Sequence, residues 1–429
     1  MKRNLMFLTT LLIFLALVSG ASAQAYIKIS ASFYSEALQE VKKIDIFLPP
    51  DYYAHLEQEY AVIYYLHGAG GNQSSGGTET NLYFYQHNQD STLTSPPAIF
   101  VKPDGSCEPY MGSMYVNSAL YGNYEDYIMQ DVIGFIEDNF RAISDKNFRF
   151  ITGLSMGGIG SARLAVTYPE MFRAAFPYIG FLAIPDTLLN SWKDMYYQDH
   201  GNYIPQLTGG TNTQLVFTMC GGFSPNMNNP PYYVDFPFDT SGVWIDSILN
   251  NWYNFDASRK VKDLPGSEEL AWFLGCGTTD YMCTYPTYQV FMDSLDTYGI
   301  NYDYRFFEGG HELNTDTWMA GMHWMDSIVN YSFRTLSVPL LEYNDFQLVV
   351  SPNPVKDQLF IEYQLREPAV VEFSVLDLYG QQLAIISMEK QQAAKYRQNY
   401  DVSKLPAGMY FCRVQIGNET ITKKIIKVQ

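Results

Sequence analysis

Short apolar runs and longer amphipathic stretches alternate along the first three quarters of the chain. Runs rich in β-forming residues occupy 26–33, 41–48, 61–66, 98–101, 148–152, 172–179, 270–274 and 302–307. Between them, apolar residues recur at helical spacing over 124–140, 156–168, 286–298 and 314–332. Strands that alternate with helices form mostly parallel sheets with helices on both faces. The pattern therefore predicts an α/β domain over residues 24–336.

Two segments depart from this alternation of strands and helices. Residues 181–265 are rich in Asn, Pro, Tyr and Gly and show no clear helix or strand, which is typical of a lid or insert over a regular sheet. Residues 346–429 contain short strand-like runs separated by glycines, and this pattern predicts a small all-β, Ig-like sandwich. Residues 337–345 then form the linker between the two domains.

The first residues have the features of a secretory signal peptide, which we place at residues 1–23. Lys2 and Arg3 precede an apolar run over 5–18, and small residues fill 21–23. The run is too short to span a bilayer, and no later run reaches that length, so we expect no transmembrane segment. We expect cleavage before Gln24 and export of the remaining chain.

Composition and charge exclude several classes of protein. Hydrophobic residues make up 47% of the 429 residues and charged residues 17%, which rules out a disordered chain. The net charge is −18; residues 24–345 carry −22, and the two ends of the chain carry +2 each. A field of this sign disfavours nucleic acids and polyanionic substrates. Among the five cysteines, Cys276 and Cys283 could form a disulfide after export or remain two buried thiols.

The strongest chemical signal is the segment Gly-Leu-Ser-Met-Gly-Gly at 153–158, between a predicted strand and a predicted helix. In such a turn the serine adopts a strained backbone conformation that pushes its hydroxyl outward. The residues two before and two after it must be small, and Gly153 and Gly157 meet that need. Ser155 is therefore the candidate nucleophile.

A serine hydroxyl becomes a good nucleophile only when a base removes its proton. His311 lies just past the last predicted sheet strand, where a loop opens on the carboxyl edge of a parallel sheet. Asp280 follows the strand at 270–274 through a glycine-containing loop. A carboxylate there would orient the imidazole and stabilise its charged form. The chain order Ser155, Asp280, His311 is the order expected of an α/β-hydrolase.

Acyl transfer also needs donors for a developing negative oxygen. The backbone N–H of Met156, directly after the candidate nucleophile, is one such donor. The segment His-Gly-Ala-Gly-Gly at 67–71 follows the strand at 61–66, and its glycines let further N–H groups turn toward the site. The chemistry implies no metal ion and no organic cofactor.

Most of the α/β domain resembles the esterase D–like family of α/β-hydrolases. That family includes the feruloyl and acetyl-xylan esterases of carbohydrate esterase family 1, S-formylglutathione hydrolase and the antigen 85 mycolyltransferases. The resemblance rests on IDIFLPPDY, YLHGAGG, GLSMGG, CGTTD and FFEGGHE, which occur in this order. It implies Ser155 as nucleophile, His311 as base and Asp280 as acid. It also implies the backbone N–H groups of Ala69 and Met156 as the oxyanion donors.

Residues 346–429 resemble the C-terminal sorting domain of the type IX secretion system of Bacteroidota. The matching segments are SPNP at 351–354, VEFSVLDLYGQQL, LPAGMYFCRV and the final KKIIKV. The resemblance implies passage through the periplasm and the outer membrane, removal of this domain, and surface attachment or release. A carbohydrate-binding sandwich is the alternative, which the basic last strand disfavours.

The sequence thus predicts a secreted serine carboxylesterase that works through a Ser-His-Asp acyl-enzyme mechanism. Its expected substrates carry feruloyl or acetyl groups on carbohydrate. One alternative is an acyltransferase of the same fold, in which a sugar hydroxyl replaces water; it stays open because the outcome depends on how well the cleft excludes water. The other is a non-catalytic glycan-binding surface protein, which the complete set of three catalytic residues disfavours.

Overall fold

The computed structural model describes residues 26–428 except 91, 94, 201–209, 265, 267–269, 283, 338–348, 352–354, 366–367, 377–381, 388–389, 407 and 417–418. The chain divides into two compact units, Met1–Phe333 and Arg334–Gln429, and each has a hydrophobic core of its own. The predicted signal peptide and most of the predicted linker lie outside the described residues. Their boundaries therefore stay predictions.

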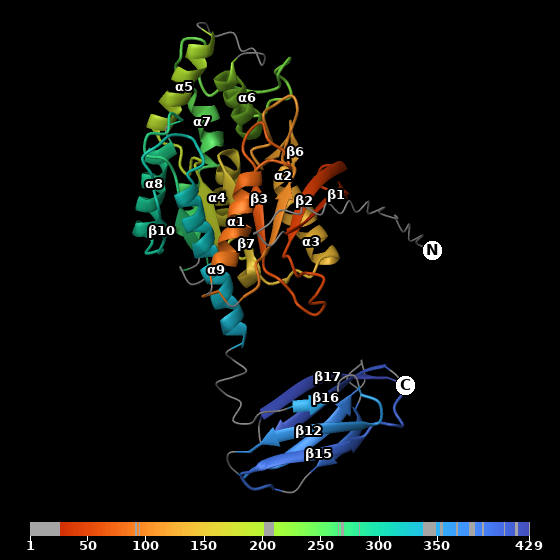
Figure 1. Ribbon diagram of the computed structural model, residues 1–429. Helices are drawn as coiled ribbons and strands as arrows, with labels where there is room; N and C mark the ends of the chain where they lie inside the picture. The colour runs from red at the N-terminus through yellow and green to blue at the C-terminus, as the bar shows by residue number, and fades with distance from the viewer. Residues whose placement is uncertain are drawn as a thin grey trace, which may run out of the picture. The chain divides into compact units, whose positions relative to one another are not determined.

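An eight-stranded sheet runs through the first unit in the order β1-β2-β4-β3-β7-β8-β9-β10 (Figure 1). Neighbouring strands from β4 to β10 pair in parallel, and β2 pairs antiparallel with both β1 and β4. This mostly parallel sheet confirms the predicted α/β-hydrolase fold class. The strands are β1 Ile27–Ser35, β2 Glu40–Leu48, β3 Val62–Leu66, β4 Ile99–Pro103, β7 Arg149–Leu154, β8 Ala174–Tyr178, β9 Ala271–Leu274 and β10 Asp303–Tyr304. A separate short ribbon pairs β5 Asn117–Ser118 with β6 Gly122–Asn123.

Helices cover both faces of this sheet. They are α1 Gly77–Gln89, α2 Tyr124–Asp126, α3 Ile133–Asn139, α4 Met156–Thr167, α8 Thr284–Thr297 and α9 Thr315–Ser337. In β3, Leu66 lies against Gly160 of α4, whereas Tyr65 bonds to Glu79 of α1 and packs on Trp318 of α9. Successive strand residues point to opposite faces. It follows that α4 covers one face and that α1 and α9 share the other.

Outside the insert, the elements of the first unit follow the predicted pattern with a few differences. The helix expected over 124–140 is interrupted by a π-helical turn, Tyr127–Val132, and a 3-10 turn, Lys146–Phe148, precedes β7. The sequence pattern misses α1, because its buried positions include the polar residues Glu79, Thr80 and His87. At the edge of the sheet, β10 is shorter than the predicted strand, and both of its residues are exposed.

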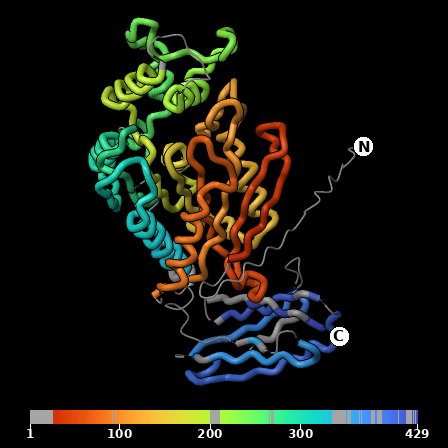
Figure 2. Tube along the Cα trace, turned by 45° about the horizontal axis from the view of Figure 1, so that its top comes forward, coloured from red at the N-terminus to blue at the C-terminus, as the bar shows by residue number. Residues whose placement is uncertain are grey.

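The insert at 181–265 is more regular than its composition predicts. It contains α5 Asp186–His200, α6 Thr211–Phe223, α7 Asp246–Tyr253 and the 3-10 turn Ala257–Asp263. Figures 1 and 2 show α5, α6 and α7 gathered beyond one end of the sheet strands. Trp192 of α5 packs against Phe181 and against Trp252 of α7. Tertiary contacts between aromatic side chains thus order a segment whose local sequence favours loops.

The second unit consists of two antiparallel sheets, in the orders β11-β12-β15 and β14-β13-β16-β17. Their buried side chains form one cluster that includes Leu359 and Phe373, as expected of the predicted sandwich. The sequence pattern misses β15, because most of its residues are polar and all of them are at least partly exposed. The strands are β11 Val349–Ser351, β12 Gln358–Gln364, β13 Val371–Leu376, β14 Gln382–Ser387, β15 Lys395–Asp401, β16 Gly408–Ile416 and β17 Glu419–Lys427.

The turn from β7 into α4 requires two residues without side chains. Ser155 adopts φ 58° and ψ −116°, a conformation that is strained for any residue other than glycine. A Cβ atom on Gly157 would overlap the carbonyl oxygen of Leu66 in β3, and one on Gly153 would overlap the carbonyl oxygen of Gly157. Helix α4 can therefore begin this close to β3 only with glycine at both positions.

Replacing Gly157 with alanine should destabilise the first unit by about 3 kcal/mol or more, since a strand carbonyl cannot move aside as a flexible side chain can. Gly134→Ala in α3 is the matched control, because a Cβ atom there meets nothing within 4 Å. Alanine at that helical position should be neutral or stabilise the protein by up to about 1 kcal/mol. Chemical denaturation measures both variants. Equal stability of the two would contradict the steric constraint.

A neutral histidine holds the loop after β3. His67 is 1% exposed, and its Nε2 atom accepts a hydrogen bond from the backbone N–H of Gly105 at 2.9 Å. Its Nδ1 atom therefore carries the proton and donates to the carbonyl oxygen of Gly68 at 2.8 Å. Burial lowers the pKa of His67, which agrees with an uncharged ring. This ring fixes the backbone that leads to Ala69.

The stability of the protein should fall as the pH drops below the ordinary histidine pKa of 6.5. The pKa of His67 is lowered in the folded state, so over that range the unfolded chain binds a proton that the folded protein does not. We expect wild type to lose more free energy of unfolding between about pH 8 and about pH 5 than His67→Gln, which cannot titrate there. Urea denaturation across this range measures the difference. An identical loss in both proteins would show that His67 accepts its proton freely when folded.

Candidate active site

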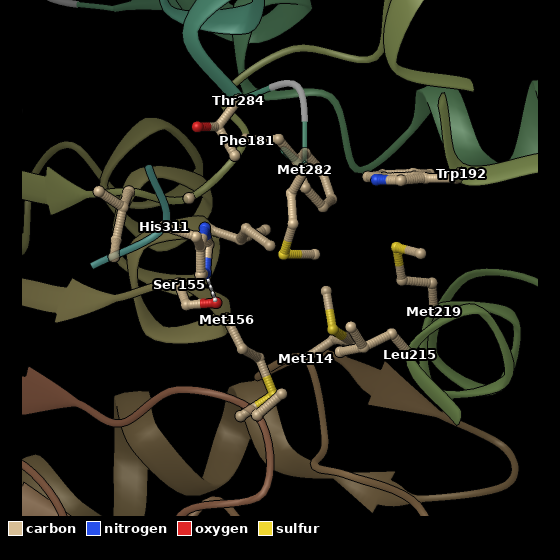
Figure 3. Close-up of a pocket in the computed structure, with 14 residues that line it drawn as sticks. Met114, Ser155, Met156, Phe181, Trp192, Leu215, Met219, Met282, Thr284 and His311 are labelled. Atoms are coloured by element: carbon tan, nitrogen blue, oxygen red, sulfur yellow. Dashed lines mark hydrogen bonds between the residues drawn. The ribbon is translucent and has the colours of Figure 1, made fainter. Parts of the chain in front are cut away.

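The three residues that the sequence analysis singled out for catalysis meet at the carboxyl edge of the sheet. His311 Nε2 lies 2.8 Å from Ser155 Oγ (Figure 3). His311 Nδ1 lies 2.7 Å from Asp280 Oδ2. The side chain of His311 is 13% exposed and that of Asp280 is fully buried. Ser155 follows β7, Asp280 follows β9 and His311 follows β10, so parallel pairing brings all three loops to the same edge.

The hydrogen-bond partners of Asp280 determine where the protons lie. Its carboxylate accepts bonds from the backbone N–H of Met282 at 2.8 Å and from the Thr284 hydroxyl at 2.7 Å. Burial by itself would raise the pKa of Asp280, but these bonds and the one from His311 outweigh it, and the pKa lies below its usual value. An ionised carboxylate only accepts hydrogen bonds. His311 Nδ1 therefore carries a proton, and Nε2 accepts the hydroxyl proton of Ser155.

Backbone hydrogen bonds hold the carboxylate loop against the imidazole loop. The N–H of Thr278 donates to the carbonyl oxygen of Phe307 at 2.9 Å, and the N–H of Thr279 donates to that of Gly309 at 3.0 Å. These bonds continue the parallel pairing of β9 and β10 past the ends of the strands. The distance between the acid and the base is thus set by the main chain rather than by flexible side chains.

Two backbone N–H groups at the site lack a hydrogen-bond partner in the described protein. In the part of the chain that the structure describes, neither the N–H of Ala69 nor that of Met156 donates to a protein acceptor. Both residues line the same pocket as Ser155. Met156 is the first residue of α4, where N–H groups have no partner within the helix and the helix dipole favours negative charge. These two donors can serve a negative oxygen on a group bound at Ser155.

An apolar pocket opens beside Ser155 and His311. It is a narrow cavity of about 30 Å³ that opens to solvent. In Figure 3 the side chains of Met114, Met219 and Met282 point into the space between the Ser155–His311 pair and Trp192. The remaining walls come from the sheet edge and the insert: Ala69, Met156, Ile159, Ile179, Gly180, Phe181, Leu215 and Thr284. Walls of this kind fit an apolar group better than a charged one.

All of the predicted site residues lie together, but the sequence pattern does not predict which residues surround them. Thr284 holds Asp280 from four positions further along the chain, and that spacing is the one signal that could have identified it. Trp192, Leu215 and Met219 belong to the insert. No local pattern predicts that they approach the site, because only the packing of α5 and α6 brings them there.

Among the described residues, the site contains neither a metal-binding group nor a disulfide bond. No group of three or more His, Cys, Asp or Glu side chains could hold a metal ion there. Cys276 is buried, and burial raises the pKa of its thiol. In the structure Cys276 is a free thiol, as in the alternative of two buried thiols, while Cys283 lies outside the described residues.

The second unit matches a known export signal. Residues 349–428 match the family described as "Secretion system C-terminal sorting domain", as the sequence analysis expects for a type IX substrate. This match indicates an exported protein that is secreted or located at the cell surface. Across the described residues, every helix is too short or too polar to cross a membrane.

Curated relatives match part of the chain. An esterase of Mycobacterium tuberculosis is 28% identical over 149 residues, which are 34% of this chain and 31% of that protein. An endo-1,4-beta-xylanase/feruloyl esterase of Xylanibacter ruminicola is 28% identical over 145 residues, or 33% of this chain and 20% of that protein. The chain thus spans less than a third of the length of these relatives.

Solved structures and the family match agree on the fold. A ferulic acid esterase structure superposes with a TM-score of 0.50 at 18% identity and covers 72% of this chain and 99% of that one. This likeness concerns the fold alone. The family described as "Putative esterase" matches residues 35–325, which is more than half of the chain and includes all of the predicted site residues, and the chain therefore belongs to this esterase family.

Proposed function

We propose that this protein is an exported serine carboxylesterase that hydrolyses esters through an acyl-enzyme on Ser155. The main support is the hydrogen-bond chain from Ser155 through His311 to Asp280. The unpaired N–H groups of Ala69 and Met156 lie beside it. Nucleophile, base, orienting acid and oxyanion donors are the parts that acyl transfer requires.

In the first half of the reaction, His311 Nε2 takes the proton of Ser155 as its Oγ atom attacks the ester carbonyl carbon. The carbonyl oxygen becomes negative, and the N–H groups of Ala69 and Met156 stabilise it. The bond to the alcohol oxygen then breaks, and His311 gives its proton to the departing alkoxide. The free alcohol leaves, and the acyl group remains esterified to Ser155.

In the second half, a water molecule replaces the alcohol. His311 Nε2 removes a proton from the water, whose oxygen attacks the acyl carbon through the same oxyanion geometry. The bond to Ser155 Oγ breaks, and His311 returns the proton to the serine. Asp280 keeps the imidazole in the required tautomer and stabilises its positive charge in both halves. The products are a carboxylic acid and the free enzyme.

Of the two acyl groups that the sequence analysis expects, feruloyl suits the pocket better than acetyl. An aromatic ring would contact the methionine sulfur atoms and the rings of Phe181 and Trp192, and such contacts are favourable. An acetyl group would make few of these contacts. We therefore propose aromatic, largely apolar acyl groups on carbohydrate as the substrates.

The route of export belongs to the same proposal. A signal peptide over residues 1–23 would direct the chain into the periplasm. The type IX machinery would then recognise residues 346–429 and carry the enzyme across the outer membrane. None of the proposed catalytic residues lies in that second unit.

Replacing Ser155 with alanine should lower kcat on a p-nitrophenyl ester by at least about three orders of magnitude, because no other group can form the acyl-enzyme. Ser144→Ala, at an exposed position outside the site, is the control and should keep the wild-type rate. Both variants should show wild-type circular dichroism. Turnover by Ser155→Ala close to wild type would contradict the mechanism.

The acyl pocket should favour feruloyl over acetyl esters of the same alcohol by about tenfold or more in kcat/KM, because the larger apolar group buries more surface. Leu215→Ser places a hydroxyl in the pocket wall and should reduce this ratio. Leu56→Ser is the control, since Leu56 is 67% exposed and lies outside the pocket. Comparing the ratio within each protein removes the effect of altered stability. A ratio that favours acetyl would exclude the aromatic acyl group.

A further inference from the structure

A second depression, unlike the apolar pocket, lies on the insert beside the active site. Its walls include Thr187, Asn190, Asp194 and Gln198 of α5, together with Asn212 of α6 and Tyr281. The α5 residues recur at intervals of three and four positions, so they lie along one face of the helix. That row extends over about 16 Å at the helical rise, which is longer than a single sugar ring. We call this depression the polar groove.

The side chains of the polar groove are open to a ligand. Asn190 and Asp194 are exposed, and in the described residues the groove's polar side chains have no hydrogen-bond or ion-pair partner in the protein. Amides and hydroxyls both donate and accept hydrogen bonds. Sugar hydroxyls have the same double capacity, so the groove matches a ligand that is rich in hydroxyl groups.

The charge of the groove excludes anionic ligands. Asp194 is its charged side chain, and no Lys or Arg lines the groove among the described residues. Residues 24–345 as a whole carry a charge of −22. A carboxylated or phosphorylated polymer would therefore be repelled. An uncharged glycan is the ligand that these walls can accept.

Tyr281 connects the polar groove to the reaction centre. Tyr281 is 64% exposed, and its ring packs edge-on against the His311 ring, with centroids 5.9 Å apart. It directly follows Asp280, so the bonds that hold the carboxylate also position this ring. A broad exposed aromatic face with a polar tip is suited to contact with a sugar.

Proton transfer from His311 determines on which side of the site the departing alcohol lies. His311 must give its proton to the departing alcohol oxygen, so that oxygen lies next to the imidazole. The apolar pocket already accounts for the acyl group. The alcohol must then extend away from that pocket, and Tyr281 with the polar groove provides a surface there.

We propose that the polar groove binds the alcohol half of the substrate, and that this half is an uncharged oligosaccharide or polysaccharide chain. This inference rests on the proposed esterase function. Asn190, Asp194, Gln198 and Asn212 hydrogen-bond to the sugar hydroxyls, and Tyr281 contacts the sugar that carries the ester. The groove contributes substrate selection and affinity rather than a step of the chemistry.

Binding without catalysis tests the groove directly. Full-length Ser155→Ala protein is measured by titration calorimetry against a soluble neutral arabinoxylan that has been stripped of esters. We expect binding, and we expect Asn190→Ala with Asp194→Ala in the same background to weaken it about tenfold, since two hydrogen-bonding groups are lost. Asp246→Ala with Asn250→Ala is the matched control. That pair is also an exposed Asp and Asn four residues apart on a helix of the insert, and its removal should leave binding unchanged.

A kinetic measurement on otherwise wild-type protein completes the test. The groove variant should lose about tenfold in kcat/KM on a feruloylated arabino-oligosaccharide relative to its own kcat/KM on p-nitrophenyl ferulate. The loss should appear mainly in KM. Equal behaviour of groove and control variants, or tighter binding of polygalacturonate than of the neutral glycan, would overturn the proposal. An active Ser155→Ala protein would instead overturn the esterase mechanism, so the two failures can be told apart.

Discussion

The strained backbone at Ser155 is the constraint on which the rest of the site depends. Its conformation costs on the order of 1–3 kcal/mol, so the surrounding structure must enforce it. The N–H of Ser155 donates to the carbonyl oxygen of Tyr178 in β8 at 2.9 Å, and Gly157 packs against the carbonyl of Leu66 in β3. The turn is thus held from both neighbouring strands. Since those strands are parallel, their following loops supply Ala69 on one side and the base of the apolar pocket on the other.

Two histidines in this unit have opposite surroundings, and the difference explains their roles. Backbone groups enclose the ring of His67. One nitrogen accepts a hydrogen bond from an N–H group and the other donates to a carbonyl oxygen, so both nitrogens have their partners while the ring is neutral. The ring of His311 instead faces the Asp280 carboxylate and the Ser155 hydroxyl. A second proton on His311 would be stabilised by Asp280. One imidazole is therefore a fixed support and the other can carry a proton between reacting atoms.

The sequence was sufficient to predict what depends on local pattern and chain order. The glycines around Ser155 are dictated by the turn itself, and the positions of Asp280 and His311 after their strands follow from the geometry of a parallel sheet. The insert could not be predicted in this way. Helices α5, α6 and α7 owe their order to contacts such as Trp192 on Trp252, which join residues 60 positions apart. Residues that shape the pocket were missed for the same reason.

Helix α5 contributes residues to both the apolar pocket and the polar groove. Trp192 points into the apolar pocket, whereas Asn190 and Asp194, two positions away on either side, line the polar groove. A helix places such neighbours on different faces, so one short segment lines both the proposed acyl pocket and the proposed glycan groove. The proposed catalytic residues lie on the sheet loops and do not depend on α5 for their hydrogen bonds. Substitutions in α5 can therefore change which ester is bound while the serine, histidine and aspartate keep their geometry. Separating recognition from chemistry in this way lets one fold serve many substrates.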